Sequence, residues 1–228
     1  MALKTDKIFS AAFMLLFLIY PVVLSAQSLT GELWVEQDPV VMDFPEDKTA
    51  EENREINQET VKNLLEDFRW IFSGMIYGYK INWIPECRNR NVKEFFQMEP
   101  AAEIPWGDPA LSVNSPVKEN GLIYISVVYS LNEAQQSRRD GWLSSGFESS
   151  GGSGKSFLGV FSRKEAIENA VKNAIRNNLH STGYNRPYRI TGTVILENFP
   201  VFGVYGAYLT VKIKLRLNLN KPEAYFAD

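Results

Sequence analysis

The spacing of apolar residues first predicts a long amphipathic helix. Apolar side chains recur every three to five residues from Ile56 to Tyr79, which is typical of one face of a helix, and Gly78 marks its expected end. Thr49 and Glu52 have the spacing of a capping box near its start. The acidic residues around that start are therefore expected to be a solvated helix terminus.

A second helix is predicted between Ser162 and Gly183. Ser162 and Glu165 have the spacing of another capping box, and an apolar stripe follows from Ile167 to Leu179. Both helices are expected to pack against a core through these stripes.

Five segments have the alternation and the β-branched or aromatic content of strands. They are residues 29–37, 79–86, 122–131, 188–197 and 208–220. The dipeptide Asn120-Gly121 precedes the third segment and favours a two-residue hairpin turn. We expect that third segment to be a central strand.

The last strand carries a row of basic residues. Odd-numbered positions from Tyr205 to Leu217 are apolar and are expected to face the core, whereas Thr210, Lys212, Lys214 and Arg216 are expected to face water. The basic row could bind an anionic polymer or headgroup. We favour a different explanation, in which these charges protect an edge strand from pairing with another chain.

Three further segments lack a clear stripe. Residues 92–98 are predicted to form a short helix before Pro100, and residues 101–113 an irregular connection rich in proline and glycine. Residues 133–156 are polar and rich in glycine and serine, which favours a mobile loop that could serve for docking.

Together these elements predict an α+β fold: a mostly antiparallel sheet with two amphipathic helices packed on it. Residues 27–108 would form an N-terminal region containing the first helix, and residues 109–228 a strand–helix–strand–strand region. We expect the two regions to pack as one compact domain.

The first 26 residues have the order of a signal peptide. Lys4 and Lys7 precede an apolar run from Ile8 to Leu24, and Ser25-Ala26 supply small residues for cleavage. We expect cleavage near Ala26 and export to the periplasm or beyond. An uncleaved N-terminal anchor is the alternative, and Pro21 within the run argues against it.

Charge and cysteine content narrow the classes of partner. Lys4, Lys7 and Asp6 give the leader a net charge of +1, so the formal charge of −3 becomes −4 without it. An acidic chain is not expected to bind nucleic acid, and no later apolar run is long enough for a transmembrane segment.

The single cysteine, Cys87, cannot form an internal disulfide and is expected to be a small buried residue, with pairing to a partner as the alternative.

No motif indicates a reactive centre or a cofactor. Residues 149–156 resemble a phosphate-binding loop, but Ser149 replaces its first glycine and the following residues favour a strand instead of a helix. His180 is the only histidine, so a histidine-rich metal site is excluded, and no G-x-S-x-G motif accompanies it. We expect no catalytic residue, metal or cofactor.

One constellation is compatible with carbohydrate. Glu103 and Asp108 flank Trp106, and an aromatic beside two carboxylates is a pattern found where glycans are gripped or cleaved. Trp83 and Trp142 could supply further stacking surfaces, although tryptophans more often fill a core. These five residues are the candidate ligand-binding residues.

Export without reactive clusters predicts a non-catalytic structural or interaction protein of the cell envelope. Its partner would be an envelope protein or a cell-wall component. One alternative is a carrier that binds glycan, or a small apolar ligand between the first helix and the sheet. The other is a glycan hydrolase that uses Glu103 and Asp108.

Overall fold

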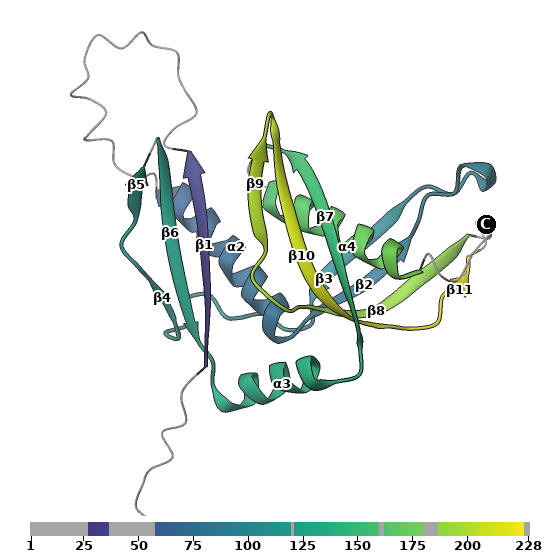
Figure 1. Ribbon diagram of the computed structural model, residues 1–228, viewed down its shortest axis with the longest axis horizontal. Helices are drawn as coiled ribbons and strands as arrows, with labels where there is room; N and C mark the ends of the chain where they lie inside the picture. The colour runs from purple at the N-terminus through teal and green to yellow at the C-terminus, as the bar shows by residue number, and fades with distance from the viewer. Residues whose placement is uncertain (1–26, 37–57, 120, 160–161, 180–186, 226–228) are drawn as a thin grey trace, which may run out of the picture.

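The computed structural model describes residues 27–36, 58–119, 121–159, 162–179 and 187–225. Its strands form two sheets, the smaller on the left of Figure 1. The smaller sheet has the order β1-β6-β4, with β5 also paired to β6. Its strands are β1 (Ser28–Glu36), β4 (Leu111–Val113), β5 (Val117–Glu119) and β6 (Leu122–Ser130).

The larger sheet has seven strands in the order β3-β2-β8-β10-β7, with β9 paired to β10 and β11 to β8. Every strand pair of both sheets is antiparallel. The strands are β2 (Tyr79–Ile84), β3 (Phe95–Pro100), β7 (Glu148–Phe157), β8 (Tyr188–Leu196), β9 (Val201–Tyr205), β10 (Tyr208–Leu219) and β11 (Glu223–Ala224). The predicted α+β class with a mostly antiparallel sheet is confirmed.

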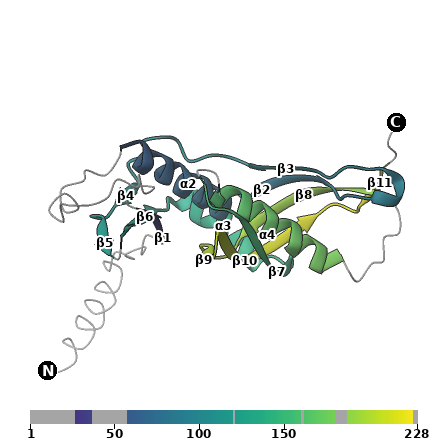
Figure 2. The ribbon, with the colours of Figure 1, turned by 90° about the horizontal axis from the view of Figure 1, so that it is seen from above.

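Three α-helices lie on these sheets in the described residues: α2 (Gln58–Ile76), α3 (Glu133–Ser144) and α4 (Ser162–Leu179). Figure 2 shows α4 lying along one face of the larger sheet, where it contacts β7 and β10. A short 3-10 helix, η1 (Arg88–Arg90), precedes β3. The predicted stripes of α2 and α4 are mostly buried, whereas Val61, Leu65 and Leu179 are half-buried.

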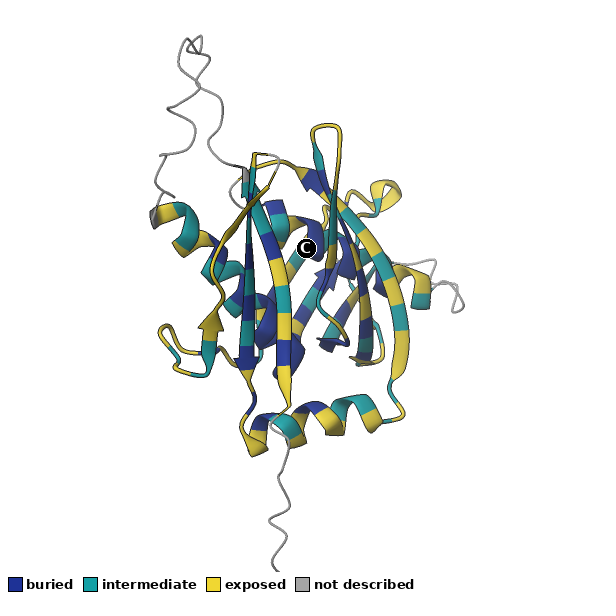
Figure 3. Ribbon diagram, turned by 60° about the vertical axis from the view of Figure 1, so that its left-hand side comes forward, coloured by how far each residue is buried: buried dark blue, intermediate teal, exposed yellow. Residues whose placement is uncertain are grey.

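The helix α2 joins the two sheets, because it contacts β1 of the smaller sheet and β8 of the larger one. Phe199 reinforces this junction: its ring centroid lies 5.8 Å from those of both Phe68 and Phe72 on α2. On its other side the ring covers Gly31 of β1, where a Cβ atom would lie 2.3 Å from it. Figure 3 shows the resulting core as the dark residues on the inner surfaces of both sheets.

The prediction of a mobile loop at 133–156 is wrong in its second half, which is strand β7. Gly152 and Gly154 lie against α4, and a Cβ atom at either position would lie 2.1 Å from a backbone oxygen, that of Ala170 or Ala166. Residues four apart on a helix rise about 6 Å and alternate strand residues about 6.7 Å, so small residues can match over a few turns of the contact. The glycines therefore permit close packing of a helix on a strand.

Asparagines of α4 complete that contact. The side-chain amides of Asn169, Asn173 and Asn177 donate to the carbonyls of Lys155, Ser153 and Gly151 at 3.0, 2.8 and 3.2 Å. β7 is an edge strand, and an edge offers hydrogen-bonding groups to other chains. The asparagine row therefore covers carbonyls of that edge.

The first half of the same segment is helix α3, which runs across one end of both sheets (Figures 1 and 3). Asn132 and Gln135 form a capping box at its start. Its buried residues are polar, Gln135 and Arg139, so it lacks the apolar stripe by which helices are recognised in a sequence.

Arg139 joins α3 to α2 and to the segment that follows β8. Its guanidinium donates to the carbonyl oxygens of Met75 at 2.8 Å and Glu197 at 2.7 Å, and more weakly to that of Leu196 at 3.4 Å. Met75 lies in the last turn of α2, where carbonyls lack helical partners. Arg139 thus links the end of α2 to the end of β8.

Other predictions are corrected by strand pairing. Residues 92–98 do not form a helix, because β3 begins at Phe95 and pairs with β2. The segment before β10 contains an additional strand, β9, so Tyr205 lies on a neighbouring strand and is 81% exposed. The basic row does not protect an edge, because β10 has partners on both sides.

Several predictions lie outside the described residues: the signal peptide and its cleavage near Ala26, the Thr49–Glu52 capping box, Asn120 and His180. In the described part of the chain, β5 pairs with β6 as expected for a hairpin, and Gly121 has a φ of 74°. None of the helices described is long and apolar enough to cross a bilayer.

Candidate functional site

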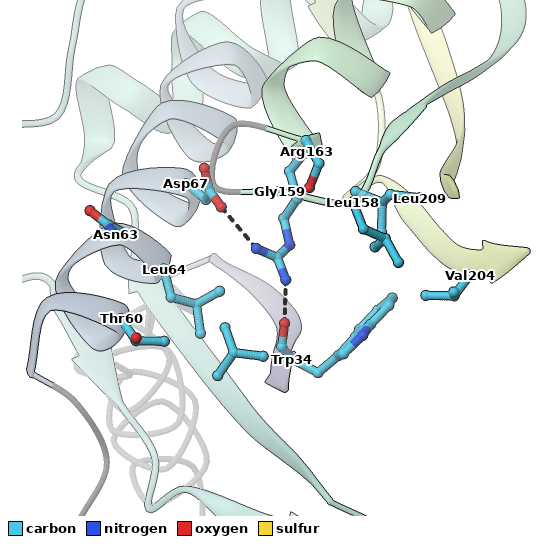
Figure 4. A pocket seen from close by; sticks show the side chains of 12 residues that line it. Trp34, Thr60, Asn63, Leu64, Asp67, Leu158, Gly159, Arg163, Val204 and Leu209 are labelled. Carbon is cyan, nitrogen blue, oxygen red and sulfur yellow. Dashed lines mark hydrogen bonds and ion pairs between the residues drawn. The ribbon is translucent and has the colours of Figure 1, made fainter. Parts of the chain in front are cut away.

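A cleft of about 370 Å³ opens where the two sheets approach each other. Figure 4 shows it between α2, the end of β1, the start of α4 and the β9–β10 hairpin. We name it the Arg163 cleft. Its apolar walls are Trp34, Val35, Leu64, Leu158, Val204 and Leu209, and its other lining residues are Thr60, Asn63, Asp67, Gly159, Ser162 and Arg163. A cleft of this size and composition is of the kind that binds small molecules.

Arg163 provides the positive charge of the cleft. It lies in the first turn of α4, and one of its terminal nitrogens is 3.1 Å from a carboxylate oxygen of Asp67. The other donates to the carbonyl oxygen of Trp34, as the dashed lines of Figure 4 mark. The guanidinium carbon also lies 6.0 Å from the centre of the Trp34 ring. Arg163 therefore joins α4, α2 and β1 at one point.

Asp67 is the acidic partner. Asn63, Leu64 and Asp67 lie three, four and seven positions after Thr60 on α2, so they share the face of the helix that lines the cleft. The side chains of Asp67 and Arg163 are only 21% and 14% exposed. Burial raises the pKa of Asp67 above its ordinary value, although the Arg163 charge and hydrogen bond act in the opposite direction.

Aromatic packing fixes the wall opposite this ion pair. The ring of Trp34 meets that of Phe202 on β9 edge to face, with centroids 6.4 Å apart and planes at 78°. Trp34 is thus held both by β9 and by the bond from its carbonyl to Arg163. The chemistry of the cleft is an apolar surface around one half-buried ion pair.

The predicted ligand-binding residues lie elsewhere. Glu103 and Trp106 do come together around Arg69 of α2: Glu103 accepts a bond from Arg69 at 3.0 Å, and the Arg69 guanidinium carbon lies 5.8 Å from the Trp106 ring centre. Trp106 is 53% exposed. This cluster on the 101–110 connection is a surface ion pair with a stacked indole.

Asp108 is part of a separate hydrogen-bond network. Its carboxylate accepts the backbone N–H of Ala110 at 2.9 Å and the hydroxyl of Tyr129 at 3.1 Å. Gln135 of α3 donates in turn to the hydroxyls of Tyr129 and Tyr77, both at 2.9 Å. Both carboxylates of the proposed pair therefore hold structural partners.

The other two candidate tryptophans are packed against the protein. Trp83 is completely buried, and its indole N–H donates to a carboxylate oxygen of Glu94 at 3.1 Å. Trp142 is half-buried at the end of α3 and packs on Phe147, with ring centroids 5.0 Å apart. The structure brings neither of them to Trp106 in any contact found among the described residues.

The other candidates are Cys87, the motif at 149–156 and a metal site. Cys87 is half-buried in a bridge with Val92 and is thus less buried than expected. The loop-like motif at 149–156 lies within strand β7. Among the described residues no three His, Cys, Asp or Glu side chains lie close enough to hold a metal ion.

Sequence reasoning missed the Arg163 cleft because its lining comes from segments distant in the chain. The alternative of a small apolar ligand between the first helix and the sheet named no residue and stays a prediction. A usable signal exists in Thr60, Asn63 and Asp67, which place polar groups beside the apolar stripe of α2. Their partner Arg163 is 96 residues from Asp67, and sequence spacing does not link them.

Comparison with known proteins assigns a family but no activity. An uncharacterized protein of Treponema pallidum (strain Nichols) is 23% identical over 197 residues, which cover 84% of this chain and 79% of that protein. No solved structure matches the chain. A protein-family model without a functional description matches residues 22–225, which include both sheets and the Arg163 cleft. The chain therefore belongs to that functionally undescribed family.

Proposed function

We propose that the protein is an exported, non-catalytic binding protein of the cell envelope that holds a small amphipathic ligand in the Arg163 cleft. The observation that carries the proposal is a cleft of about 370 Å³ with apolar walls around a single half-buried ion pair. Sites for small molecules commonly combine apolar walls with a few fixed polar groups.

The two kinds of lining suit the two parts of such a ligand. Trp34, Leu158 and Val204 offer apolar surface to an apolar body. At the polar end Asn63 is exposed and provides an amide. Arg163 has further N–H groups beyond the two contacts described, and its buried Nε has no hydrogen-bond partner among the described residues. An acceptor oxygen on the ligand would suit these donors.

The same chemistry favours binding over catalysis. An arginine is too basic to exchange protons near neutral pH, and Asp67 is engaged by Arg163. The alternative of a glycan hydrolase has less support, because Glu103 is paired with Arg69 and Asp108 accepts bonds from Ala110 and Tyr129. A general acid and base need carboxylates that are free to act on substrate.

Location in the envelope is part of the proposal and is supported by the sequence of residues 1–26. The apolar run behind Lys4 and Lys7 and the small residues Ser25-Ala26 are the features of an export signal. An envelope protein or a cell-wall component remains the proposed partner.

Ligand retention tests the proposal. Native mass spectrometry of protein recovered from its own cells should show a bound small molecule. The probe 1-anilinonaphthalene-8-sulfonate should bind the same protein in competition with that molecule. Asn63→Trp, which fills the mouth of the cleft, should abolish both. Lys62→Trp is the matched control, since Lys62 is the exposed neighbour on α2 and does not line the cleft.

Equal binding by both variants would exclude the Arg163 cleft as the site. Absence of any ligand, together with probe binding that neither variant changes, would contradict the proposed function itself. Unfolding curves of the two variants should overlay, because both substitutions are on the surface of the same helix.

A further inference from the structure

The β9–β10 turn and the end of β7 form an apolar tip, which we define as Phe157, Leu158, Val204 and Tyr205. These side chains are 67%, 44%, 52% and 81% exposed, and they are four of the nine large hydrophobic residues that the described part of the chain exposes. The backbone N–H of Leu158 donates to the carbonyl of Ala207 at 3.1 Å, which holds the two segments together. Figure 1 shows the β9–β10 hairpin projecting at one end of the larger sheet.

Aromatic rings cover one face of this tip. Tyr208 is paired in register with Phe157 on one side and Tyr205 on the other, so the three side chains point to the same face of the sheet. The rings of Phe157 and Tyr208 have centroids 4.4 Å apart. The Lys155 ammonium lies 4.9 Å from the centre of the Tyr208 ring. No charged residue occurs in residues 156–159 or 201–211.

Lysines follow directly behind the rings. Lys155 and Lys212 lie on the same face two and four residues from the Phe157–Tyr208 pair, or about 7 and 14 Å along the strands. Both are exposed, and neither forms an ion pair within the described residues. Residues 149–158 and 201–222 contain no acid, although the chain as a whole has a formal charge of −3. Lys155 and Lys212 thus place two basic side chains behind an uncharged tip in an acidic protein.

We propose that the apolar tip docks the protein on a membrane surface that contains anionic lipid. A segment that lies in the membrane interface buries its apolar groups about 5–10 Å deep, at the boundary between headgroups and acyl chains. At that depth Lys155 would reach the level of the lipid phosphates. Tyrosine suits this boundary because its ring is apolar and its hydroxyl is polar.

The aliphatic members of the tip favour a bilayer over a soluble polyanion. A polymer in water would neutralise Lys155 and Lys212 but leave Leu158 and Val204 exposed to water, whereas a bilayer removes both from water. Leu158 and Val204 also line the Arg163 cleft, so docking would place the mouth of the cleft at the lipid surface. This inference goes beyond the proposed function, since docking does not require an occupied cleft.

Fluorescence tests the depth of the tip. Tyr205→Trp in the exported protein, with its N-terminus read by mass spectrometry, is mixed with vesicles of phosphatidylcholine alone or with about one third phosphatidylglycerol. The emission that Tyr205→Trp adds to that of the five native tryptophans, taken as the difference from the wild-type protein, should shift to the blue only with the anionic vesicles, and lipid-borne bromine should quench it. Phe95→Trp is the control, because Phe95 is 46% exposed on β3, the opposite edge of the sheet from β7. No shift, or an equal shift in both, overturns the proposal.

Vesicle sedimentation tests how much the lysine and the apolar side chains contribute to vesicle binding. Lys155→Gln should weaken binding about fivefold, since a basic residue near an anionic surface contributes about 1 kcal/mol. Lys93→Gln, an exposed lysine beside β3, should change nothing. Phe157→Ser combined with Val204→Ser should weaken binding about tenfold or more. Circular dichroism checks that the variants are folded.

The remaining outcomes separate lipid from protein and docking from cleft binding. Binding to native membranes but not to protein-free vesicles overturns the lipid proposal in favour of a membrane protein partner. Asn63→Trp should still bind vesicles, because it closes the Arg163 cleft and leaves the tip unchanged. Loss of vesicle binding in that variant contradicts an independent docking tip.

Discussion

At the residue scale, small side chains decide how α4 packs on the larger sheet. Ala166, Ala170 and Ala174 are completely buried, and Gly152 and Gly154 of β7 lie against them. A residue without Cβ usually weakens a strand. Here it is required, because the helix backbone occupies the space that a Cβ atom would need.

Gly154→Ala is expected to lower the free energy of unfolding by about 3 kcal/mol or more. Its Cβ atom would lie 2.1 Å from the carbonyl oxygen of Ala166 and 2.4 Å from the backbone nitrogen of Ala170, and neither backbone atom can turn aside as a side chain can. Urea denaturation measures the change.

Gly151→Ala is the control for that substitution. Gly151 is in the same strand, and the nearest atom to an added Cβ would be the Ile213 carbonyl oxygen at an ordinary 3.7 Å. Because glycine within a strand costs about 0.5–1 kcal/mol relative to alanine, this change should be neutral or slightly stabilising. Equal destabilisation by both substitutions would mean that the contact with α4 does not require glycine.

At the element scale, α3 shows how a helix can form without an apolar stripe. Gln135 and Arg139 are four residues apart, so both point from one face toward the end of α2 and the sheet. Burial lowers the pKa of Arg139 from its ordinary value, although the charges of Asp140 and Glu197 act in the opposite direction. Its hydrogen bonds to buried carbonyls offset the cost of that burial.

Arg139→Ala should destabilise the protein by about 3 kcal/mol or more. The carbonyls of Met75 and Glu197 would lose a charged donor, and each buried group left without a partner costs about 1–3 kcal/mol. Amide hydrogen exchange should show α3 opening before the sheets. Arg138→Ala is the matched control, since Arg138 is exposed and, among the described residues, would lose only the contact of its guanidinium with the Tyr77 ring, whose centre is 5.6 Å away. Similar losses in both variants would contradict a specific role for Arg139.

At the scale of the whole molecule, ion pairs of Glu197, which is buried, and of Glu94, which is partly exposed, make stability depend on pH. Burial acts to raise the pKa of Glu197, but hydrogen bonds from Lys214 and Ser149 and the charges of Lys214 and Arg216 outweigh it, so the pKa is lowered. Burial also acts to raise the pKa of Glu94. Hydrogen bonds from Lys172 and Trp83 and the charges of Lys172 and Arg176 outweigh burial, so this pKa is lowered as well. A carboxylate with a lowered pKa stabilises the fold above its unfolded pKa and loses that contribution as the pH falls through the folded one.

Glu197→Gln should therefore cost about 2 kcal/mol at pH 7, the scale of charged hydrogen bonds in a half-buried site. The difference between this variant and the wild type should shrink as the pH falls below about 4, because the wild-type carboxylate then becomes protonated. Urea unfolding at a series of pH values measures it. Glu119→Gln, an exposed residue of β5, should show no such difference, and a Glu197→Gln cost that is constant with pH would contradict the ion-pair explanation.

Export is also a property of the whole chain. Protein recovered from its own cells should begin near Gln27, because the small residues Ser25-Ala26 precede that position. Mass spectrometry of the N-terminal peptide decides this. A chain that still begins at Met1 or Ala2 would instead indicate an anchored or unexported protein.

Elements with a clear local pattern were predictable, and those that depend on a partner were not. The stripe of α2 and the alternation of β10 reflect burial of one face each, and the structure confirms both. The β3 segment had apolar content suited to a helix or a strand, and pairing with β2 decided between them. β7 was hidden because glycine and serine are typical of loops, although glycines two apart and alanines four apart together predict a close helix–strand contact.

The amino-acid sequence by itself determined the fold class, both apolar helices and most long strands, because each of these depends on the local period of apolar residues. The tertiary structure decided where the 133–156 segment folds, why the basic row of β10 is not at an edge, and which residues form a cleft. Arg163, Asp67 and Trp34 come from three separate segments, and only packing brings them within bonding distance. Sites of that kind depend on long-range contacts, which local periodicity does not encode.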